Sequence, residues 1–395
     1  MSKQEKDIIA DWQVASASGG GNYGFLDGIR GIAILMVVAS HTFYVNPEST
    51  GLVRIIGNAI HAGTLGVTVF FTLSGFLIAL PFWKQKMKNG ATVPPGYLVR
   101  RFWKIYPPLA LTVLMFTPIY AGLYGNAGEY WKTASQWITG AAWVVPVSSR
   151  VNPVMWSLIV EVHFYLLLPL CFLILRRLSY NTALIAISSG FLLLPPICRQ
   201  IYAGFGIQPS LHPVINVCFP VNLDAFAFGV LVAGLHARGW VGMKPAGIAP
   251  VGLLVLPVLL FHGVLGDWMS PAVVHYGVML ATACMLCFIG DPVRAASWGV
   301  NAAWLRWLGL ISYEWYLIHQ PLFFWSWRVY GLAGGNPFKY AAIVLTPMAL
   351  GLVLAAVLYR YYSLPILKRT RGRTAAMVAT SKGGGGISAE WNEKN

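Results

Sequence analysis

The chain alternates between long, almost uninterrupted apolar runs and short connections that carry most of its polar residues. Each run is close to the roughly 20 apolar residues that one helical bilayer crossing needs. The runs lack the strict alternation of membrane-spanning strands, which excludes a β-barrel. The pattern predicts an all-α, polytopic transmembrane helical bundle of about ten spans. The ten runs lie near residues 29–46, 60–81, 106–125, 154–175, 181–198, 217–235, 247–265, 271–290, 307–327 and 338–360.

The composition excludes a water-soluble domain. Hydrophobic residues make up 57% of the 395 residues and charged residues only 10%, and the mean hydropathy is +0.62. Soluble domains carry about 25% charged residues. The net charge of +15 would suggest nucleic acid as the partner of a soluble protein. Here the charges lie between apolar runs, so we expect the lipid bilayer and no nucleic acid as a partner.

The distribution of Lys and Arg sets the predicted orientation. With a cytoplasmic N-terminus, the inner segments hold 22 of the 28 Lys and Arg residues and the outer loops hold six. This asymmetry is the positive-inside pattern that orients membrane helices. We therefore expect a multi-pass protein of the cell (inner) membrane with both termini in the cytoplasm.

The ends of the chain differ from the apolar body. The N-terminal sequence MSKQEKDIIADWQ has no short apolar core before a cleavage site, so it does not resemble a removable signal peptide. The expected organisation is a cytoplasmic segment (1–24), a ten-helix membrane domain (25–365) and a basic, then polar, disordered cytoplasmic tail (366–395).

The five cysteines lie in or at the ends of apolar runs, and none has the partners that a metal site needs. No metal is therefore expected. Cys198 and Cys218 flank one outer loop and could pair, although two unpaired cysteines are the favoured interpretation.

Ionisable side chains inside spans are costly and are functional candidates by default. The candidates are Arg30, His41, Glu161, Asp224, Glu314 and His319. Arg30 and His41 are eleven residues apart, which on a helix is about 20° beyond three turns and about 16.5 Å of rise. One stripe of the first span thus carries a cation at the inner edge and an imidazole past mid-depth. A long anionic ligand fits this geometry; an interfacial arginine and a structurally hydrogen-bonded histidine are the alternative.

A second group lies in the span at 154–175. Ser157, Glu161 and Tyr165 recur every four residues and share one helix face. Glu161 would lie at a depth comparable with that of His41. It could orient the imidazole or store a proton, or it could make a structural hydrogen bond between helices.

The stretch RRFWKIYPP lies at the inner mouth of the third span. Arg100, Arg101 and Lys104 would suit a phosphate site, because arginine forks match phosphate oxygens. Helix orientation alone is the alternative explanation. In the second span, Ser74 and Gly75 permit either close helix approach or a backbone opening for a ligand.

The ninth span places Ser312, Tyr316 and His319 along one stripe, and Pro321 should kink the helix and free a backbone carbonyl. His319 is a weaker catalytic candidate than His41, because its neighbours within the span are neutral. Asp224 is expected to hold helices together. In the outer loop 126–153, Tyr130, Trp131, Trp137 and Trp143 could stack on a sugar ring, although an interfacial aromatic belt is more common.

Five motifs in order and spacing resemble the acyltransferase 3 family of integral-membrane O-acyltransferases, which includes polysaccharide O-acetylases and macrolide O-acylases. The resemblance covers residues 25 to about 365. It rests on FLDGIRGIAILMVVASH (25–41), FFTLSGFL (70–77), RRFWKIYP (100–107), WSLIVEVHFYLLLP (156–169) and SYEWYLIHQP (312–321).

The resemblance implies ten spans, a cytoplasmic acyl-CoA donor and transfer to a hydroxyl of a carbohydrate, glycolipid or similar acceptor. It assigns the family's essential pair to Arg30 and His41, the basic motif to Arg100 and Arg101, and the motif carboxylate to Glu161. No bound cofactor is expected; acyl-CoA, with acetyl-CoA favoured, is a co-substrate.

Two mechanisms are compatible with these residues. His41 is either the general base that deprotonates the acceptor hydroxyl or a transient acyl carrier, with Glu161 in support. Ser74, Ser157, Tyr165, Tyr316 and His319 are candidate supporting residues. The competing class is a proton-coupled transporter or flippase that uses the same intramembrane groups. The acceptor, the acyl chain length and the oligomeric state stay open.

Overall fold

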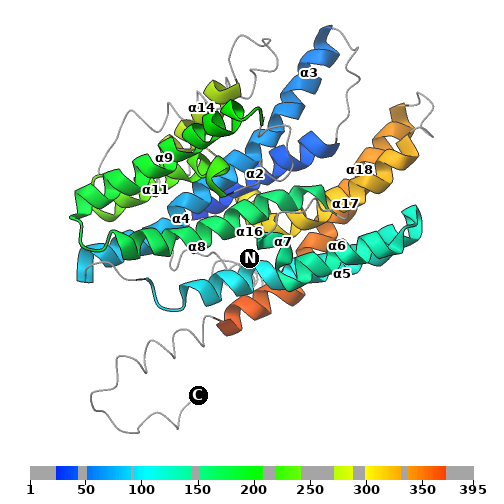
Figure 1. The fold of residues 1–395 in the computed structure, drawn as a ribbon. Coiled ribbons are helices and arrows are strands. Elements are labelled where there is room, and N and C mark those ends of the chain that lie inside the picture. Colours follow the sequence, from blue (N-terminus) through cyan, green and yellow to red (C-terminus); the bar gives the residue numbers. More distant parts are fainter. Residues whose placement is uncertain are drawn as a thin grey trace, which may run out of the picture.

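The computed structural model describes residues 24–42, 51–89, 93–144, 152–207, 219–241, 271–287, 299–330 and 337–370. Within these ranges the chain forms helices and turns and no strand (Figure 1). The predicted all-α class is confirmed. The N-terminal segment before Gly24, the seventh expected span (247–265) and residues 371–395 lie outside the described residues.

Long helices make up most of the described chain, with shorter helical segments between them. Their bounds are α2 (Gly24–Thr42), α3 (Gly51–His61), η1 (Ala62–Leu65), α4 (Gly66–Asn89), α5 (Tyr97–Tyr124), α6 (Ala127–Thr139), α7 (Ala141–Val144), η2 (Pro153–Met155), α8 (Trp156–Ile174), α9 (Tyr180–Gly204), η4 (Phe219–Asn222), α11 (Asp224–Ala237), α14 (Pro271–Leu286), α16 (Ala303–Leu310), α17 (Ser312–Tyr330), α18 (Pro337–Leu358) and the π-helical turn η7 (Tyr359–Ser363).

Six helical stretches within the described ranges are long and apolar enough to cross a membrane. They are Gly24–Thr42, Ile56–Lys88, Tyr97–Tyr124, Pro153–Ile174, Tyr180–Gly204 and Phe338–Thr370. Two shorter apolar helices, Asp224–Ala237 and Val273–Leu286, fall in the sixth and eighth predicted spans. The chain is therefore a multi-pass membrane protein, and the total of ten spans stays a prediction.

Three predicted boundaries were wrong. The third span begins as α5 at Tyr97 rather than near residue 106, so the basic stretch lies inside a helix and not in a loop. Pro94, Pro95 and Gly96 set this start, because Gly96 takes a left-handed conformation with φ 64°. The ninth span is interrupted at Ile311 between α16 and α17, and the last helix continues to Thr370, into the predicted tail.

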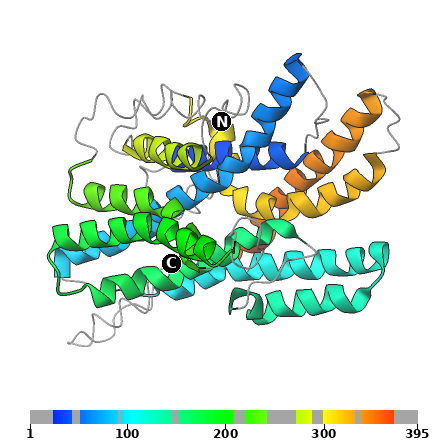
Figure 2. The ribbon, with the colours of Figure 1, turned by 45° about the horizontal axis from the view of Figure 1, so that its top comes forward.

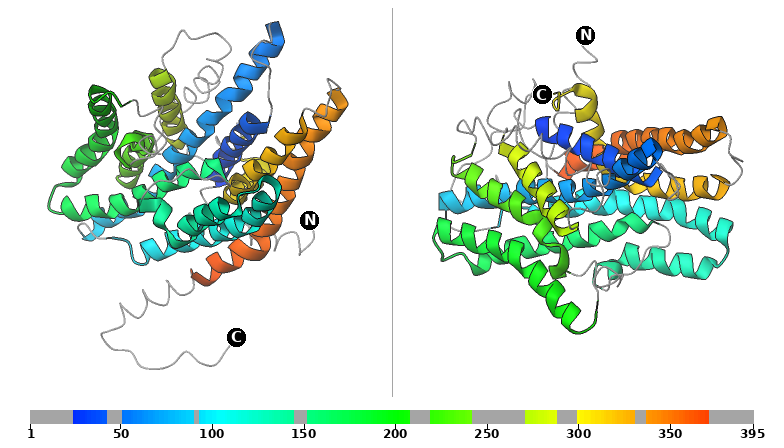
Figure 3. Two further views of the ribbon diagram at one scale, coloured as in Figure 1. Left: turned by 45° about the vertical axis from the view of Figure 1, so that its right-hand side comes forward. Right: turned by 90° about the horizontal axis from the view of Figure 1, so that it is seen from above.

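The contacts between helices show their relative directions. α4 and α8 run the same way, since Ser74 meets Glu161 near one end and Phe82 meets Phe172 near the other. α9 and α11 run oppositely: the Tyr180 hydroxyl donates to the carbonyl oxygen of Gly234 at 2.7 Å near one end, and Arg199 donates to Asp224 near the other. α17 and α18 lie side by side (Figure 3). The directions of these two helix pairs agree with the predicted order of the spans, in which α4 and α8 are the second and fourth and α9 and α11 the fifth and sixth.

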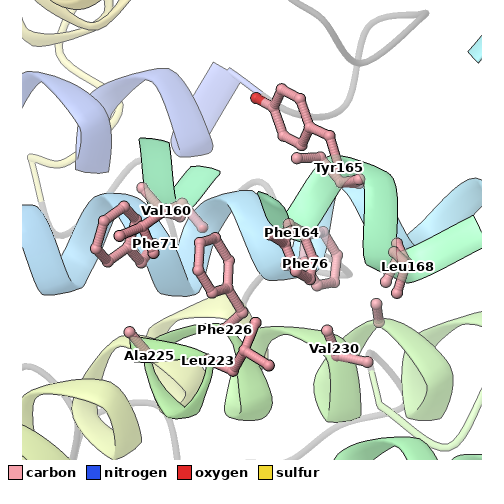
Figure 4. Packing of buried hydrophobic residues seen from close by; sticks show 14 of the residues in the cluster. Phe71, Phe76, Val160, Phe164, Tyr165, Leu168, Leu223, Ala225, Phe226 and Val230 are labelled. Carbon is pink, nitrogen blue, oxygen red and sulfur yellow. The ribbon is translucent and has the colours of Figure 1, made fainter. Parts of the chain in front are cut away.

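An aromatic core joins α4, α8 and α11. The rings of Phe164 and Phe226 stack at 4.1 Å between centroids, and the ring of Phe71 lies 4.9 Å from that of Phe226 (Figure 4). The backbones approach closely at Gly75, where an added Cβ would lie 2.4 Å from the carbonyl oxygen of Phe226. The predicted close approach at Gly75 is confirmed, and it fixes α4 beside α11.

Two prolines inside helices leave carbonyl oxygens without their usual helical partner, and other elements supply donors. Pro169 frees the carbonyl of Tyr165, which accepts from the Tyr97 hydroxyl at 3.2 Å. Pro321 frees the carbonyl of Leu317, which accepts from Asn152 Nδ2 at 2.7 Å. The first bond connects α5 to α8, and the second connects Asn152, which precedes η2, to α17.

Asp224 holds helices together, as predicted. Its fully buried carboxylate accepts from Arg199 of α9 at 2.5 Å and from the hydroxyl of Tyr276 of α14 at 3.0 Å. Arg199 also donates to the carbonyl of Val221 at 2.6 Å. Cys198 is a free thiol, and Cys218 lies outside the described residues.

Gly75→Ala should destabilise the bundle by about 1–3 kcal/mol, because α4 and α11 must move apart. Gly190→Ala is the matched control, since an added Cβ there meets nothing within 4 Å and alanine favours a helix. Thermal unfolding in detergent measures the difference. Equal melting temperatures for the two variants would contradict the close α4–α11 contact.

Candidate functional site

A cavity lies where α2, α4, α5, α8 and α17 meet. Its volume is about 70 Å³, room for about five water molecules. Eight of the residues singled out from the sequence line this one cavity: Arg30, Ser74, Lys104, Ser157, Glu161, Tyr165, Ser312 and Tyr316. Five separate segments therefore converge on one polar space within an apolar bundle.

Arg30 and His41 both face α17, so the predicted shared stripe of α2 is confirmed. Arg30 Nη2 donates to Ser312 Oγ at 3.2 Å, and His41 Nδ1 lies 3.3 Å from His319 Nε2. Ser312 and His319 are seven residues apart on α17, about 20° short of two turns. The stripe of α2 that carries Arg30 and His41 thus faces the stripe of α17 that carries Ser312 and His319, and the two helices run in the same direction.

His41 and His319 form a pair of imidazoles next to the cavity. Their ring centroids are 5.3 Å apart, with His319 fully buried and His41 partly exposed. His319 Nδ1 lies 2.8 Å from the carbonyl oxygen of Tyr316 and 3.2 Å from that of Trp315. The ring of Tyr316, which lines the cavity, lies 5.7 Å from the ring of His319. Tyr316 thus connects the cavity wall to the histidine pair.

Glu161 does not contact the histidines, contrary to the supporting role expected from the sequence. Its Oε1 accepts from Ser74 Oγ at 3.0 Å and from the Tyr165 hydroxyl at 2.5 Å. The expectation rested on helical depth alone, which does not tell which way a helix face points. His319 takes the place beside His41, and Glu161 lines the cavity.

The four basic candidates divide between the cavity and its surroundings. Arg30 and Lys104 line the cavity. The guanidinium of Arg101 lies over the rings of Tyr165 and Tyr97, at 5.6 and 5.8 Å. Arg100 is farther away and donates to the carbonyl of Pro95 at 2.5 Å. The structure therefore brings two cations into the cavity, with a third beside its wall.

The structure also brings together Ser157 of α8 and Tyr316 of α17, whose hydroxyls are hydrogen-bonded at 2.7 Å. Tyr313 lines the cavity as well, and its hydroxyl donates to the carbonyl of Ile105 at 2.7 Å. Sequence reasoning missed Tyr313 and also Asn152, the partner of the carbonyl freed by Pro321. The freed carbonyl was the available signal, because a buried acceptor within a membrane requires a donor.

Glu314 lies off the cavity-facing stripe, as the sequence spacing indicates. It is 3% exposed and lies close to Ser363 of the π-helical turn η7. Glu314 is therefore buried between α17 and the turn that follows α18. His163, which the sequence places away from the Glu161 face, does not line the cavity.

The outer aromatic residues do not form the suggested stacking surface as a set. Trp137 of α6 is 1% exposed and packs in the core, whereas Trp131 is 46% exposed. α6 lies along α5 (Figure 2), held by the Tyr106 hydroxyl, which donates to the carbonyl of Ile138 at 2.5 Å. A buried indole cannot stack on a sugar, so Trp137 is removed from the acceptor candidates.

Comparison with known proteins identifies a family. The acyltransferase 3 family model, described as an acyltransferase domain, matches residues 23–360. The chain is 25% identical over 367 residues to acyltransferase MdmB of Streptomyces mycarofaciens, covering 87% of this chain and 91% of that protein. No solved structure matches the chain.

Two longer relatives match over part of their length. The chain is 24% identical over 372 residues to peptidoglycan O-acetyltransferase OatA of Listeria monocytogenes, covering 87% of this chain and 55% of that protein. It is 24% identical over 379 residues to O-acetyltransferase OatA of Staphylococcus aureus, covering 87% of this chain and 57% of that protein. The chain thus spans about half the length of these two relatives.

A cysteine placed at Ser74 should be reachable by a small water-soluble thiol reagent. Ser74→Cys should react about tenfold faster than Ser188→Cys, because Ser74 lines the cavity and Ser188 is buried outside it. Mass spectrometry of labelled, detergent-purified protein measures both rates against the unsubstituted chain. Equal labelling at the two positions would mean that the cavity is closed to solvent.

Proposed function

The chain belongs to the acyltransferase 3 family of membrane O-acyltransferases, and on that premise we propose its donor, acceptor and reacting groups. It moves an acyl group, most simply acetyl, from cytoplasmic acyl-CoA to a hydroxyl of a carbohydrate or glycolipid. The observation that carries the proposal is the meeting of Arg30, Lys104 and Glu161 in one cavity whose wall residue Tyr316 contacts the His41–His319 pair.

The donor's phosphates are held at the end of the cavity that carries Arg30 and Lys104. Guanidinium and ammonium groups are the usual protein partners of phosphate oxygens. Arg101, beside the cavity wall, adds a third cation, whereas Arg100 supports the start of α5. The Lys and Arg distribution supports a cytoplasmic location for this end of the cavity and for both termini.

His41 Nε2 is the reacting atom. In direct transfer it takes the proton from the acceptor hydroxyl while the oxygen attacks the thioester carbon, the C–S bond breaks and the thiolate leaves with that proton. In covalent transfer Nε2 itself attacks the thioester carbon, the C–S bond breaks and the thiolate leaves. The acceptor oxygen then attacks the acyl carbon, the bond from that carbon to Nε2 breaks, and the freed ring nitrogen takes the hydroxyl proton and passes it to water. Both routes release free coenzyme A and use the same atom.

The size of the cavity and the names of relatives both favour a small acyl group on a polysaccharide hydroxyl. A volume of about 70 Å³ admits an acetyl group, and two relatives are O-acetyltransferases, one of them of peptidoglycan. The hydroxyls of Ser157 and Tyr316, together with the Glu161 carboxylate, provide acceptors and donors for the hydroxyl groups of a carbohydrate.

His41→Ala should lower thiol release from acetyl-CoA by at least about 100-fold, since general base catalysis typically contributes 10²- to 10⁴-fold. Purified protein is mixed with a cell-surface glycan and lipid extract, and released thiol is followed optically. His163→Ala is the control, because this histidine lies on α8 outside the cavity. Equal release by parent and His41→Ala would overturn the assignment, and absence of thiol release with parental protein would favour the transporter alternative.

The same assay distinguishes the two routes. Rapid mixing with radiolabelled acetyl-CoA, without acceptor, leaves labelled protein only if His41 carries the acyl group. Direct transfer leaves the protein unlabelled.

Arg30→Lys should raise the KM for acyl-CoA about tenfold while changing kcat little. The lysine ammonium lacks the planar, two-pronged donor geometry of the guanidinium, which also donates to Ser312. Arg176→Lys is the matched control, since Arg176 is exposed at the end of α8. Steady-state kinetics with varied acetyl-CoA measure both constants. An unchanged KM would remove Arg30 from the donor site.

A further inference from the structure

His319 lies against backbone groups that determine which of its ring nitrogens carries a proton. Its Nδ1 is 2.8 Å from the carbonyl oxygen of Tyr316 and 3.2 Å from that of Trp315. Carbonyl oxygens only accept hydrogen bonds, so Nδ1 must be the donor. A neutral imidazole has one donor and one acceptor, and therefore His319 Nε2 presents a lone pair.

That lone pair points at His41. His319 Nε2 and His41 Nδ1 are 3.3 Å apart, so His41 Nδ1 carries the proton that completes this hydrogen bond. This hydrogen bond selects the tautomer in which His41 Nε2 is free of a proton.

His319 is suited to accept a hydrogen bond and not to hold a charge. It is fully buried, and the rings of Tyr316 and Phe323 lie 5.7 and 6.4 Å from it. Among the described residues no ion pair joins His319 to a carboxylate, so an imidazolium at this position would be a buried charge without a counter-ion. His319 is therefore suited to remain neutral while His41 takes up the proton of the acceptor hydroxyl.

We propose that His319 is a positioning residue of the acyl transfer: as a neutral acceptor, it orients the His41 ring and keeps Nε2 as the reacting atom. This inference rests on the proposed function. It assigns to a second histidine the orienting task that an acidic residue performs in hydrolase triads. The proton that Nε2 takes up leaves with the thiolate and does not pass to His319.

Three variants separate hydrogen bonding from packing. His319→Leu removes the acceptor, His319→Gln keeps a carbonyl oxygen that can reach His41 Nδ1, and Phe323→Leu alters only the neighbouring packing. His319→Leu should lower kcat about 10- to 100-fold, as loss of an outer hydrogen-bond partner typically does, with the KM for acetyl-CoA unchanged. His319→Gln should restore most of kcat, and Phe323→Leu should retain it at a comparable melting temperature.

The tautomer itself is a second readout that needs no active variant. ¹⁵N NMR of histidine-labelled parental protein should show His41 protonated at Nδ1 and bare at Nε2, with the signals assigned by their loss in His41→Ala. A proton on His41 Nε2 would overturn the inference. So would equal losses of kcat in His319→Gln and His319→Leu.

Failure of this inference can be told from failure of the proposed function. If His41→Ala abolishes thiol release but His319→Leu turns over like the parent, only the role of His319 is wrong. If His41→Ala turns over like the parent, the proposed reacting group is wrong. If His319→Leu does not fold, the NMR tautomer of the parental protein decides.

Discussion

The alignment of α2 with α17 is the constraint on which the site depends. Two contacts hold it: Arg30 with Ser312 and His41 with His319. The contacts are eleven residues apart on α2 and seven on α17, about 16.5 and 10.5 Å of rise. The difference is accommodated because the arginine side chain is long and can extend along the helices. A shift of either helix by one residue would turn one member of each pair away.

The bilayer explains why so many bonds around the site end on backbone carbonyls. In hydrocarbon each unpaired backbone group costs several kcal/mol. Prolines within α8 and α17 each free one carbonyl, and Tyr97 and Asn152 fill those positions. His319 satisfies its Nδ1 in the same way. These elements therefore cannot slide along one another without leaving polar groups unpaired.

Two groups of buried ionisable residues differ in how much of their hydrogen-bonding capacity is used by partners within the protein. The Asp224 carboxylate is fully buried, and Arg199 and Tyr276 both donate to it, so it serves as a closed structural connection. Arg30, Lys104 and Glu161 instead face a cavity, where part of their hydrogen-bonding capacity remains available to a ligand. The same residue types therefore stabilise helices in one place and provide a binding surface in the other.

The sequence by itself determined the helical class and the shared stripe of Arg30 and His41, because apolar run length and the 3.6-residue period are local properties. It also placed Ser157, Glu161 and Tyr165 on one face. Only the tertiary structure decided that Glu161 pairs with Ser74 and Tyr165, that His319 meets His41, and that Trp137 is buried. Those outcomes depend on how each helix is rotated against its neighbours. That rotation is set by contacts such as Gly75 with Phe226 between residues far apart in the chain.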